Sequence, residues 1–268
     1  HMDLSKIKMV VTDMDGTLLN SNHEVSKRFF TIFSALQSKD ILFVAASGRQ
    51  YNSIVDKLAP IKNQIIVVAE NGGYVKQQDK ELLTTPLPLN YVTETLKILR
   101  DFPDMHPVLC GKNTAYLTGK SDAFVGKLKE YYSEFDVVTA LENVSAEIIK
   151  VAIYHFNSSE HFIYPHVKHL ENKLQVKISG SNWVDISSPN ANKGFAIQEL
   201  MNHHNVMRDE LMVFGDYNND LEMLALTDFS FAMENAHDMV KKTANHQTES
   251  NDNFGVEIVL EKLYSQLA

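Results

Sequence analysis

Short apolar runs alternate along the first third of the chain with stretches in which apolar residues recur every three or four positions. The runs predict buried strands at Ile7–Thr12, Ile41–Ala46 and Ile65–Ala69. The periodic stretches between them predict helices over Ser26–Ser38 and Tyr51–Leu58. Strands that alternate with helices in this way are typical of an α/β fold built on a parallel sheet.

The pattern changes between about residues 86 and 187. Hairpins are expected around Gly111-Lys112-Asn113 and around Gly180, where short apolar runs flank glycine-containing turns. The elements expected here are helices over Leu89–Arg100, Asp122–Tyr132 and Ser158–Lys173, and strands over Val108–Cys110, Ala115–Thr118, Ile148–Phe156, Val176–Ser179 and Trp183–Ile186. Pro165 predicts a kink or a late start in the third of these helices.

After Asn192-Lys193-Gly194 the first pattern returns. The elements expected in this last stretch are helices over Phe195–His203, Asp220–Leu226 and Val256–Leu267, and strands over Leu211–Phe214 and Phe229–Met233. The simplest interpretation is a parallel-sheet α/β core made of residues 1–85 and 188–268. An inserted α+β domain of residues 86–187 interrupts it.

Composition excludes several classes of protein. The longest unbroken apolar run is Ile41–Ala46, whereas a membrane-spanning helix needs roughly 20 such residues. The formal charge is −9, and a nucleic-acid surface usually shows a basic excess, so neither a membrane nor a nucleic acid is expected as a partner. A small anionic substrate remains compatible, because a local site can be positive on an acidic protein. The single cysteine, Cys110, excludes an internal disulfide and fits a reducing cytoplasm.

The strongest chemical signal is Asp13-Met14-Asp15-Gly16-Thr17, at the end of the first predicted strand. Ligands of parallel α/β sheets bind at the carboxyl ends of the strands, so both carboxylates could meet one ligand there. Gly16 allows the backbone to turn sharply beside that ligand. Taken alone, the motif is explained about as well by a turn with capping aspartates, or by a calcium loop, as by such a ligand-binding site.

Two further strand ends carry suitable groups. Asp216 follows another buried strand, and Asp13, Asp216 and a backbone carbonyl would make a plausible oxygen-ligand site for Mg²⁺. Ser47-Gly48-Arg49 offers a hydroxyl and backbone amides to a phosphate, whose remaining charge Lys193 could neutralise. The alternatives are a helix-capping serine, a solvated lysine and a solvated loop that caps the helix at Asp220. No glycine-rich nucleotide-binding loop is present.

Together the four segments, in the order Asp-x-Asp-x-Thr, Ser, Lys and Gly-Asp-x-x-x-Asp, resemble the haloacid dehalogenase (HAD) superfamily of aspartate-nucleophile phosphatases. Asn71-Gly72-Gly73 and Asn218-Asn219-Asp220-x-x-Met223 are similar to its Cof-type subfamily. The resemblance spans nearly the whole chain and implies a Rossmann-like core with an inserted cap. Only the segment between Ser47 and Lys193 is long enough to hold the cap, which implies a cap of α/β subtype B over residues 86–187.

The resemblance also implies a mechanism. Asp13 would be the nucleophile that forms an aspartyl-phosphate, and Asp15 would be the general acid and then the general base. That role implies a raised pKa for Asp15. Mg²⁺ would be held by Asp13, the Asp15 carbonyl and Asp216, while Ser47 and Lys193 would bind the phosphoryl oxygens.

Other residues receive supporting roles from the same resemblance. Asn219 and Asp220 would orient Lys193 or metal-bound water. The expected substrate-binding residues are Thr17, Gly48, Arg49, Asn71 and Gly72. In the cap, the loop tips near Gly111–Asn113 and Gly180–Trp183 are candidates for substrate specificity, although core packing is the favoured role for Trp183.

The resulting hypothesis is a Mg²⁺-dependent phosphatase of small phosphate monoesters. The resemblance implies sugar phosphates as usual substrates, with pyridoxal phosphate and flavin mononucleotide-type compounds as further ones. We expect a cytoplasmic monomer or weak homo-oligomer. Three alternatives remain open: a phosphosugar mutase of the phosphomannomutase type, a non-catalytic ligand-binding member, and, more weakly, a dehalogenase.

Overall fold

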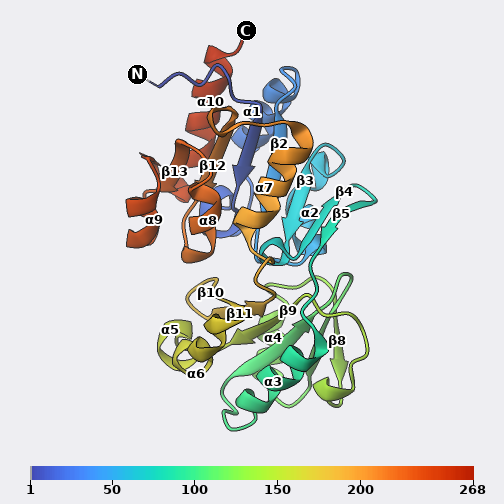
Figure 1. The fold of residues 1–268 in the computed structure, drawn as a ribbon. Coiled ribbons are helices and arrows are strands. Elements are labelled where there is room, and N and C mark those ends of the chain that lie inside the picture. Colours follow the sequence, from blue (N-terminus) through green and yellow to red (C-terminus); the bar gives the residue numbers. More distant parts are fainter. Residues whose placement is uncertain (1) are drawn as a thin grey trace.

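A large, mainly parallel sheet forms one half of the molecule in the computed structural model, which describes residues 2–268 (Figure 1). Its strands, in spatial order, are β14 (His246–Thr248), β13 (Phe229–Met233), β12 (Leu211–Gly215), β1 (Met9–Thr12), β2 (Leu42–Ala46), β3 (Ile66–Ala69), β4 (Tyr74–Gln77) and β5 (Lys80–Thr84). The strands from β14 to β3 are parallel, and β4 and β5 add an antiparallel edge. We call this sheet the core sheet.

Helices cover both faces of the core sheet (Figure 1). They are α1 (Lys27–Gln37), α2 (Tyr51–Lys57), α7 (Lys193–His204), α8 (Leu221–Leu224), α9 (Asp238–Thr243) and α10 (Gly255–Gln266). Among them α1 packs against α10, and α8 packs against α7 and α9. The central strand β1 is buried along its whole length, as expected for a parallel strand covered on both faces.

A second sheet, the cap sheet, forms the other half (Figure 1). Its strands, in spatial order, are β10 (Gln175–Ile178), β11 (Trp183–Ser187), β9 (Lys150–Tyr154), β6 (His106–Cys110), β7 (Ala115–Thr118) and β8 (Phe135–Val138). All its neighbours are antiparallel except β7 and β8. The same half carries α3 (Leu89–Leu99), α4 (Asp122–Leu128), α5 (Ser159–Phe162) and α6 (Tyr164–Val167). The predicted α/β fold class is confirmed.

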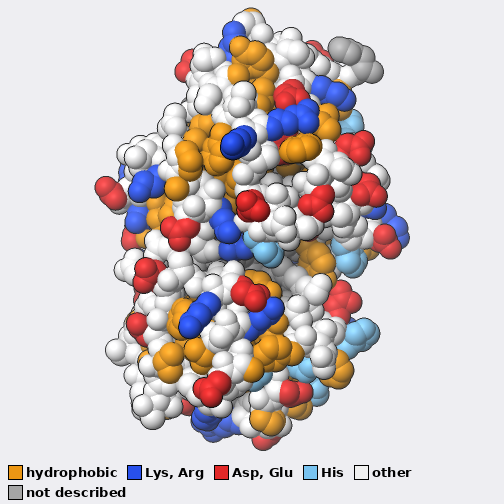
Figure 2. All heavy atoms as spheres, turned by 180° about the vertical axis from the view of Figure 1, so that it is seen from behind, with side chains coloured by type: hydrophobic (Ala, Val, Ile, Leu, Met, Phe, Trp, Pro, Cys, Tyr) orange, Lys and Arg blue, Asp and Glu red, His pale blue; other side chains and the backbone are white. Residues whose placement is uncertain are grey.

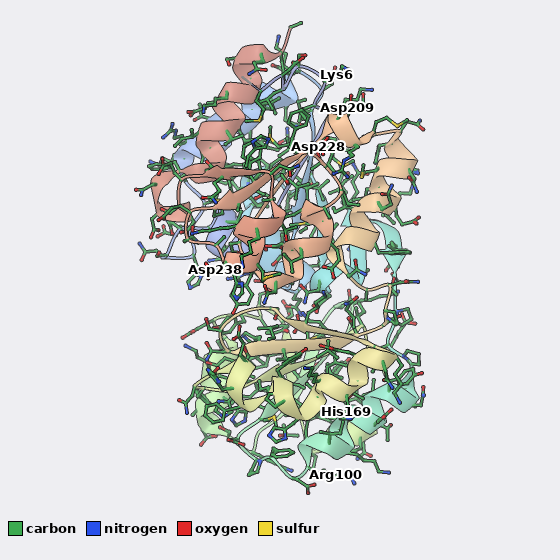
Figure 3. The ribbon with its side chains drawn as sticks, turned by 60° about the vertical axis from the view of Figure 1, so that its left-hand side comes forward. Lys6, Arg100, His169, Asp209, Asp228 and Asp238 are labelled. Atoms are coloured by element: carbon green, nitrogen blue, oxygen red, sulfur yellow. The ribbon has the colours of Figure 1, made fainter. Side chains whose placement is uncertain are left out.

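Charged side chains lie in the outer parts of both halves. Lys6 and Asp209 lie in the upper part of the core half, and Arg100 lies at the far end of the cap half (Figure 3). The surface is indented where the two halves meet (Figure 2). Among the described residues, no helix is both long enough and apolar enough to cross a membrane.

Several elements differ from the sequence expectations. The helix predicted over Ser158–Lys173 is broken at Ile163 into α5 and α6, because Pro165 disfavours helical continuation at the preceding turn. Ser158 caps the start of α5, since its side chain accepts from the backbone N–H of His161. The pattern did not predict β4, β5, β8, β14 and α9, which are short and largely partly exposed, so they lack a continuous apolar signature.

A buried carboxyl links α1 to α10 and makes a pH-dependent prediction. Glu257 accepts a hydrogen bond from Ser26, 2.6 Å away, and burial raises the pKa of Glu257 despite that bond. The folded protein therefore holds this proton more tightly than the unfolded chain, and stability is lost as pH rises through the raised pKa. We expect Glu257→Gln to raise the unfolding temperature at about pH 8, with the gain disappearing near pH 4.

Circular dichroism melts at both pH values test this expectation. Glu261→Gln serves as the matched control, because Arg28 lowers the pKa of Glu261 and its loss should act in the opposite direction. A Glu257→Gln variant that melts below the parent at about pH 8 contradicts the prediction.

Candidate active site

Two carboxylates meet where neighbouring parallel strands end. Asp13 follows β1 and Asp216 follows β12, and these strands pair in parallel register. Thr17 donates to Asp13 Oδ2 at 3.0 Å, and its hydroxyl lies 3.3 Å from Asp216 Oδ1. Gly16, at φ 75°, belongs to the same turn, and a Cβ there would overlap Asp216. Only glycine therefore lets this turn pass so close to the second carboxylate.

Lys193 lies fully buried at the start of α7. Its Nζ is 2.9 Å from Asp13 Oδ1 and 2.7 Å from Asp220 Oδ1. Burial acts to lower the pKa of Lys193, but Asp13 and Asp220 outweigh burial and raise it. Burial and Asp13 raise the pKa of Asp220 to about 6, against the opposing effect of Lys193. The lysine therefore carries a permanent positive charge beside Asp13.

The carboxylates fit a divalent cation. Asp13, Asp216 and Asp220 each offer an oxygen, and these atoms lie within 4.8 Å of one another. The two oxygens of Asp220 bind Lys193 and the backbone N–H of Asp216, and Asp220 does not line the cavity, whereas Asp13 and Asp216 do and are the better placed ligands. Burial and the charge of Asp13 raise the pKa of Asp216 well above its usual range. A hard cation with oxygen ligands, such as Mg²⁺, would relieve this repulsion.

Asp15 corrects the sequence-based expectation. Arg49 donates two hydrogen bonds to its carboxylate, from Nε to Oδ2 at 2.6 Å and from Nη2 to Oδ1 at 2.7 Å. Burial acts to raise the pKa of Asp15, but Arg49, helped by His23, outweighs burial and lowers it. The predicted raised pKa of Asp15 is therefore wrong, because the ion pair with Arg49 favours the charged form of the carboxyl.

The turn after β2 carries the other predicted phosphate ligands. Ser47 Oγ accepts from the backbone N–H of Arg49 at 2.9 Å. The Gly48 carbonyl accepts from Lys150 Nζ at 2.5 Å, so a residue of the cap sheet holds this turn. We call residues 47–49 the Ser47 turn.

A cavity of about 410 Å³ lies between the two halves. The predicted residues that line it are Asp13, Asp15, Ser47, Gly48, Arg49, Asp216 and Asn219. Thr17, Asn71, Gly72, Lys193 and Asp220 do not line it. Asn71 instead donates through Nδ2 to Asp185 and accepts from Asn219 Nδ2 at 3.0 Å. These contacts place Asn71 between the halves, and its predicted role in substrate binding stays a prediction.

The cap half contributes lining residues that the sequence analysis missed. Lys150, Asp185, Tyr131 and Tyr132 all face the cavity. The detectable signal was a charged residue inside an otherwise apolar strand, as in Lys-Val-Ala-Ile-Tyr and Trp-Val-Asp-Ile. Trp183, for which packing was favoured, is buried against Tyr154 with ring centres 4.9 Å apart and also borders the cavity.

Known proteins match this chain over nearly its full length. The sequence-family model of the haloacid dehalogenase-like hydrolases matches residues 10–260 of this chain. The 5-amino-6-(5-phospho-D-ribitylamino)uracil phosphatase YbjI of Escherichia coli (strain K12) is 32% identical over 263 residues, covering 96% of each chain. YitU of Bacillus subtilis (strain 168), which has the same enzyme name, is 24% identical over 97% of this chain and 99% of its own.

A solved structure has the same fold. SMU.1108c from Streptococcus mutans UA159 superposes with a TM-score of 0.90 at 30% identity, covering 97% of this chain and 99% of its own. The resemblance inferred from the motifs is thus confirmed by family model, relatives and fold. The chain belongs to the haloacid dehalogenase-like hydrolase family.

Proposed function

We propose that this protein is a Mg²⁺-dependent phosphatase that hydrolyses small phosphate monoesters through an aspartyl-phosphate on Asp13. One observation carries the proposal: Asp13 borders the cavity with one oxygen bound to Lys193 and the other to Thr17. A carboxylate held in this way is pre-oriented for attack, and Lys193 screens its charge from an approaching phosphate.

The proposed reaction has two covalent steps. An Asp13 oxygen attacks phosphorus in line, and the bond from phosphorus to the leaving oxygen breaks. Asp15 gives a proton to that oxygen, then takes one from the water that attacks the phosphorus and frees Asp13. Ser47, which lines the cavity, would bind the phosphoryl oxygens, and Lys193 would join it from its place beside Asp13. Mg²⁺, held by Asp13, Asp216 and the Asp15 carbonyl, would offset repulsion between the carboxylate and the anionic substrate.

The acid step requires Asp15 to gain a proton that Arg49 now disfavours. Arg49 lines the cavity, and a phosphoryl group offers the same two-oxygen partner as a carboxylate. We propose that substrate draws Arg49 away from Asp15, so that the carboxyl protonates only when a phosphate is bound. Asn219 and Asp220 would meanwhile keep Lys193 and metal-bound water in place.

The cavity favours a phosphorylated polyol or sugar. Tyr131 and Trp183 line it beside the polar side chains of Asn182 and Ser181. A planar ring can stack on the former, and hydroxyls can bond to the latter. The names of the Escherichia coli and Bacillus subtilis relatives describe a ribityl phosphate attached to a uracil ring, which has both features. We further propose a cytoplasmic enzyme, monomeric or weakly associated, with residues 86–187 as its cap.

Phosphate release from a panel of sugar, ribityl and cofactor phosphates tests this function. We expect release with Mg²⁺ and a loss of about 10²-fold or more in EDTA, since a bound metal supplies several kcal/mol. Product analysis of each reaction separates hydrolysis from the mutase alternative, which returns the phosphoryl group to the sugar. Release that persists unchanged in EDTA contradicts the metal assignment, and no release from any compound contradicts the hydrolase.

A further inference from the structure

A buried lysine of the cap sheet contacts the core half outside the predicted catalytic set. Lys150 opens β9 and is 1% exposed. Its Nζ lies 3.2 Å from Glu70 Oε2 and 3.2 Å from Asp185 Oδ2, and it donates to the Gly48 carbonyl at 2.5 Å. Asp185 belongs to the neighbouring strand β11, whereas Glu70 and Gly48 belong to the core half. One ammonium group therefore bridges the two halves.

The bridge reaches loops that follow three strands of the core sheet. Gly48 follows β2, and Glu70 follows β3. Asp185 accepts from Asn71, whose side-chain oxygen accepts from Asn219 after β12. The Lys150–Asp185 pair thus contacts the ends of β2 and β3 directly and the end of β12 through Asn71.

The local backbone requires such support. Glu70 and Asn71 have φ values of 54° and 56°, a conformation that costs free energy for residues other than glycine. Burial raises the pKa of Glu70, while the charges of Asp185 and Glu70 keep the pKa of Lys150 above its ordinary value despite burial. Apolar side chains would hold the two halves together at a lower cost in free energy, because buried charges must first lose their hydration. A buried charge cluster at this place therefore favours a role in fixing the positions of nearby groups over a role in holding the halves together.

Geometry connects Lys150 to the Ser47 turn. The Gly48 carbonyl and the Arg49 N–H belong to one planar peptide unit, so fixing the carbonyl fixes the direction of that N–H. The same N–H donates to Ser47 Oγ at 2.9 Å. The position of the Ser47 hydroxyl, which borders the cavity, therefore depends on a contact from the cap sheet.

We propose that Lys150 is a positioning residue that sets the Ser47 turn for phosphoryl binding only when the cap half sits against the core half. The proposal rests on the proposed phosphatase function and adds a coupling between cap closure and the phosphate site. It implies that Lys150 acts on every substrate equally, because it orients the phosphoryl ligands and does not select the leaving group.

Kinetics of Lys150→Met in the full chain test this role with two substrates, acetyl phosphate and the best larger compound of the panel. We expect kcat/KM to fall by about 10²-fold for both, the scale of a misplaced ligand, and inhibition by inorganic phosphate to weaken. A loss confined to the larger compound, with phosphate inhibition unchanged, overturns the proposal and makes Lys150 a wall of the substrate pocket.

Two further variants distinguish a positioning role of Lys150 from a general loss of structure. Lys150→Met leaves the carboxyl groups of Glu70 and Asp185 buried without their cation, so the charge-balanced Lys150→Met/Glu70→Gln/Asp185→Asn variant is measured beside it. It should show the same loss on both substrates. Lys177→Met breaks another ion pair between the halves, with Glu222, away from the Ser47 turn, and should keep kcat within about twofold of the parent.

A parent protein that releases no phosphate would contradict the phosphatase function and would leave the positioning role of Lys150 open to a binding test. If the parent releases no phosphate, calorimetric titration of parent and charge-balanced variant with inorganic phosphate and Mg²⁺ still reports on the Ser47 turn. Weaker phosphate binding by the variant supports the positioning role, and equal binding refutes it.

Discussion

Asp13→Asn is expected to reduce phosphate release by a factor on the order of 10⁴ or more, the scale seen when a covalent nucleophile is removed. The amide is uncharged and a poor nucleophile, so no aspartyl-phosphate can form at this position. It also gives up half of the ion pairing that holds Lys193, whose Nζ is 2.9 Å from Asp13 Oδ1. Steady-state phosphate release measures the loss of activity, and acid-quenched labelling with ³²P-substrate measures how much phosphoenzyme forms.

Asp15→Asn is the matched control for that experiment. With p-nitrophenyl phosphate, whose leaving group needs little protonation, the phosphoenzyme should form and accumulate because the water step has lost its base. A labelled protein from Asp15→Asn and none from Asp13→Asn would assign the two aspartates. An Asp13→Asn variant that retains more than about a tenth of parental activity rejects Asp13 as the nucleophile.

Lys193→Met should have the second largest effect, on stability and on activity together. The substitution leaves Asp13 and Asp220 buried without their cation, which costs about 3–5 kcal/mol when one partner of a buried pair is removed. For a chain of this size that corresponds to a fall of about 10 °C in Tm. Phosphate release should fall as well, because Lys193 would bind the phosphoryl oxygens.

The double variant Lys193→Met/Asp220→Asn separates the two effects. Removing one of the stranded charges should restore much of the lost Tm, while phosphate release stays low. Thermal melts and kinetics on the same preparations give both readouts. A single variant that melts with the parent contradicts the structural role of the ion pairs, and full activity in the double variant contradicts the phosphoryl-binding role.

Much of the fold was predictable from the apolar runs, and part of the site was predictable because its carboxylates follow the ends of those runs. Parallel strands bring their carboxyl ends to one edge, so Asp13 and Asp216 could be placed together although they are far apart in sequence. The α/β class and the family were correctly inferred from these motifs. The division into residues 1–85 with 188–268 and 86–187, and the roles of the site residues, stay predictions.

Side-chain pairing was not predictable from the same pattern. Arg49 could bind substrate or Asp15, and only packing shows that Ser53 and Asp15 both hold it. Likewise no sequence spacing brings Gly48, Lys150 and Asp185 together, since Gly48 lies in a turn of the core half and the other two lie in strands of the cap sheet. The hairpin β4–β5 was not predicted because its edge strand β5 is partly exposed and has no continuous apolar run.

The position of β1 has a consequence for how the chain folds. This strand lies between β2, formed soon after it, and β12, which is about 200 residues further along the chain. All strands of the cap sheet lie between residues 106 and 187, so that sheet can pair during synthesis before β12 exists. Until residues 211–215 emerge from the ribosome, β1 presents an unpaired apolar edge beside Asp13. The nascent chain is therefore most vulnerable to aggregation after its cap has formed and before its catalytic edge closes.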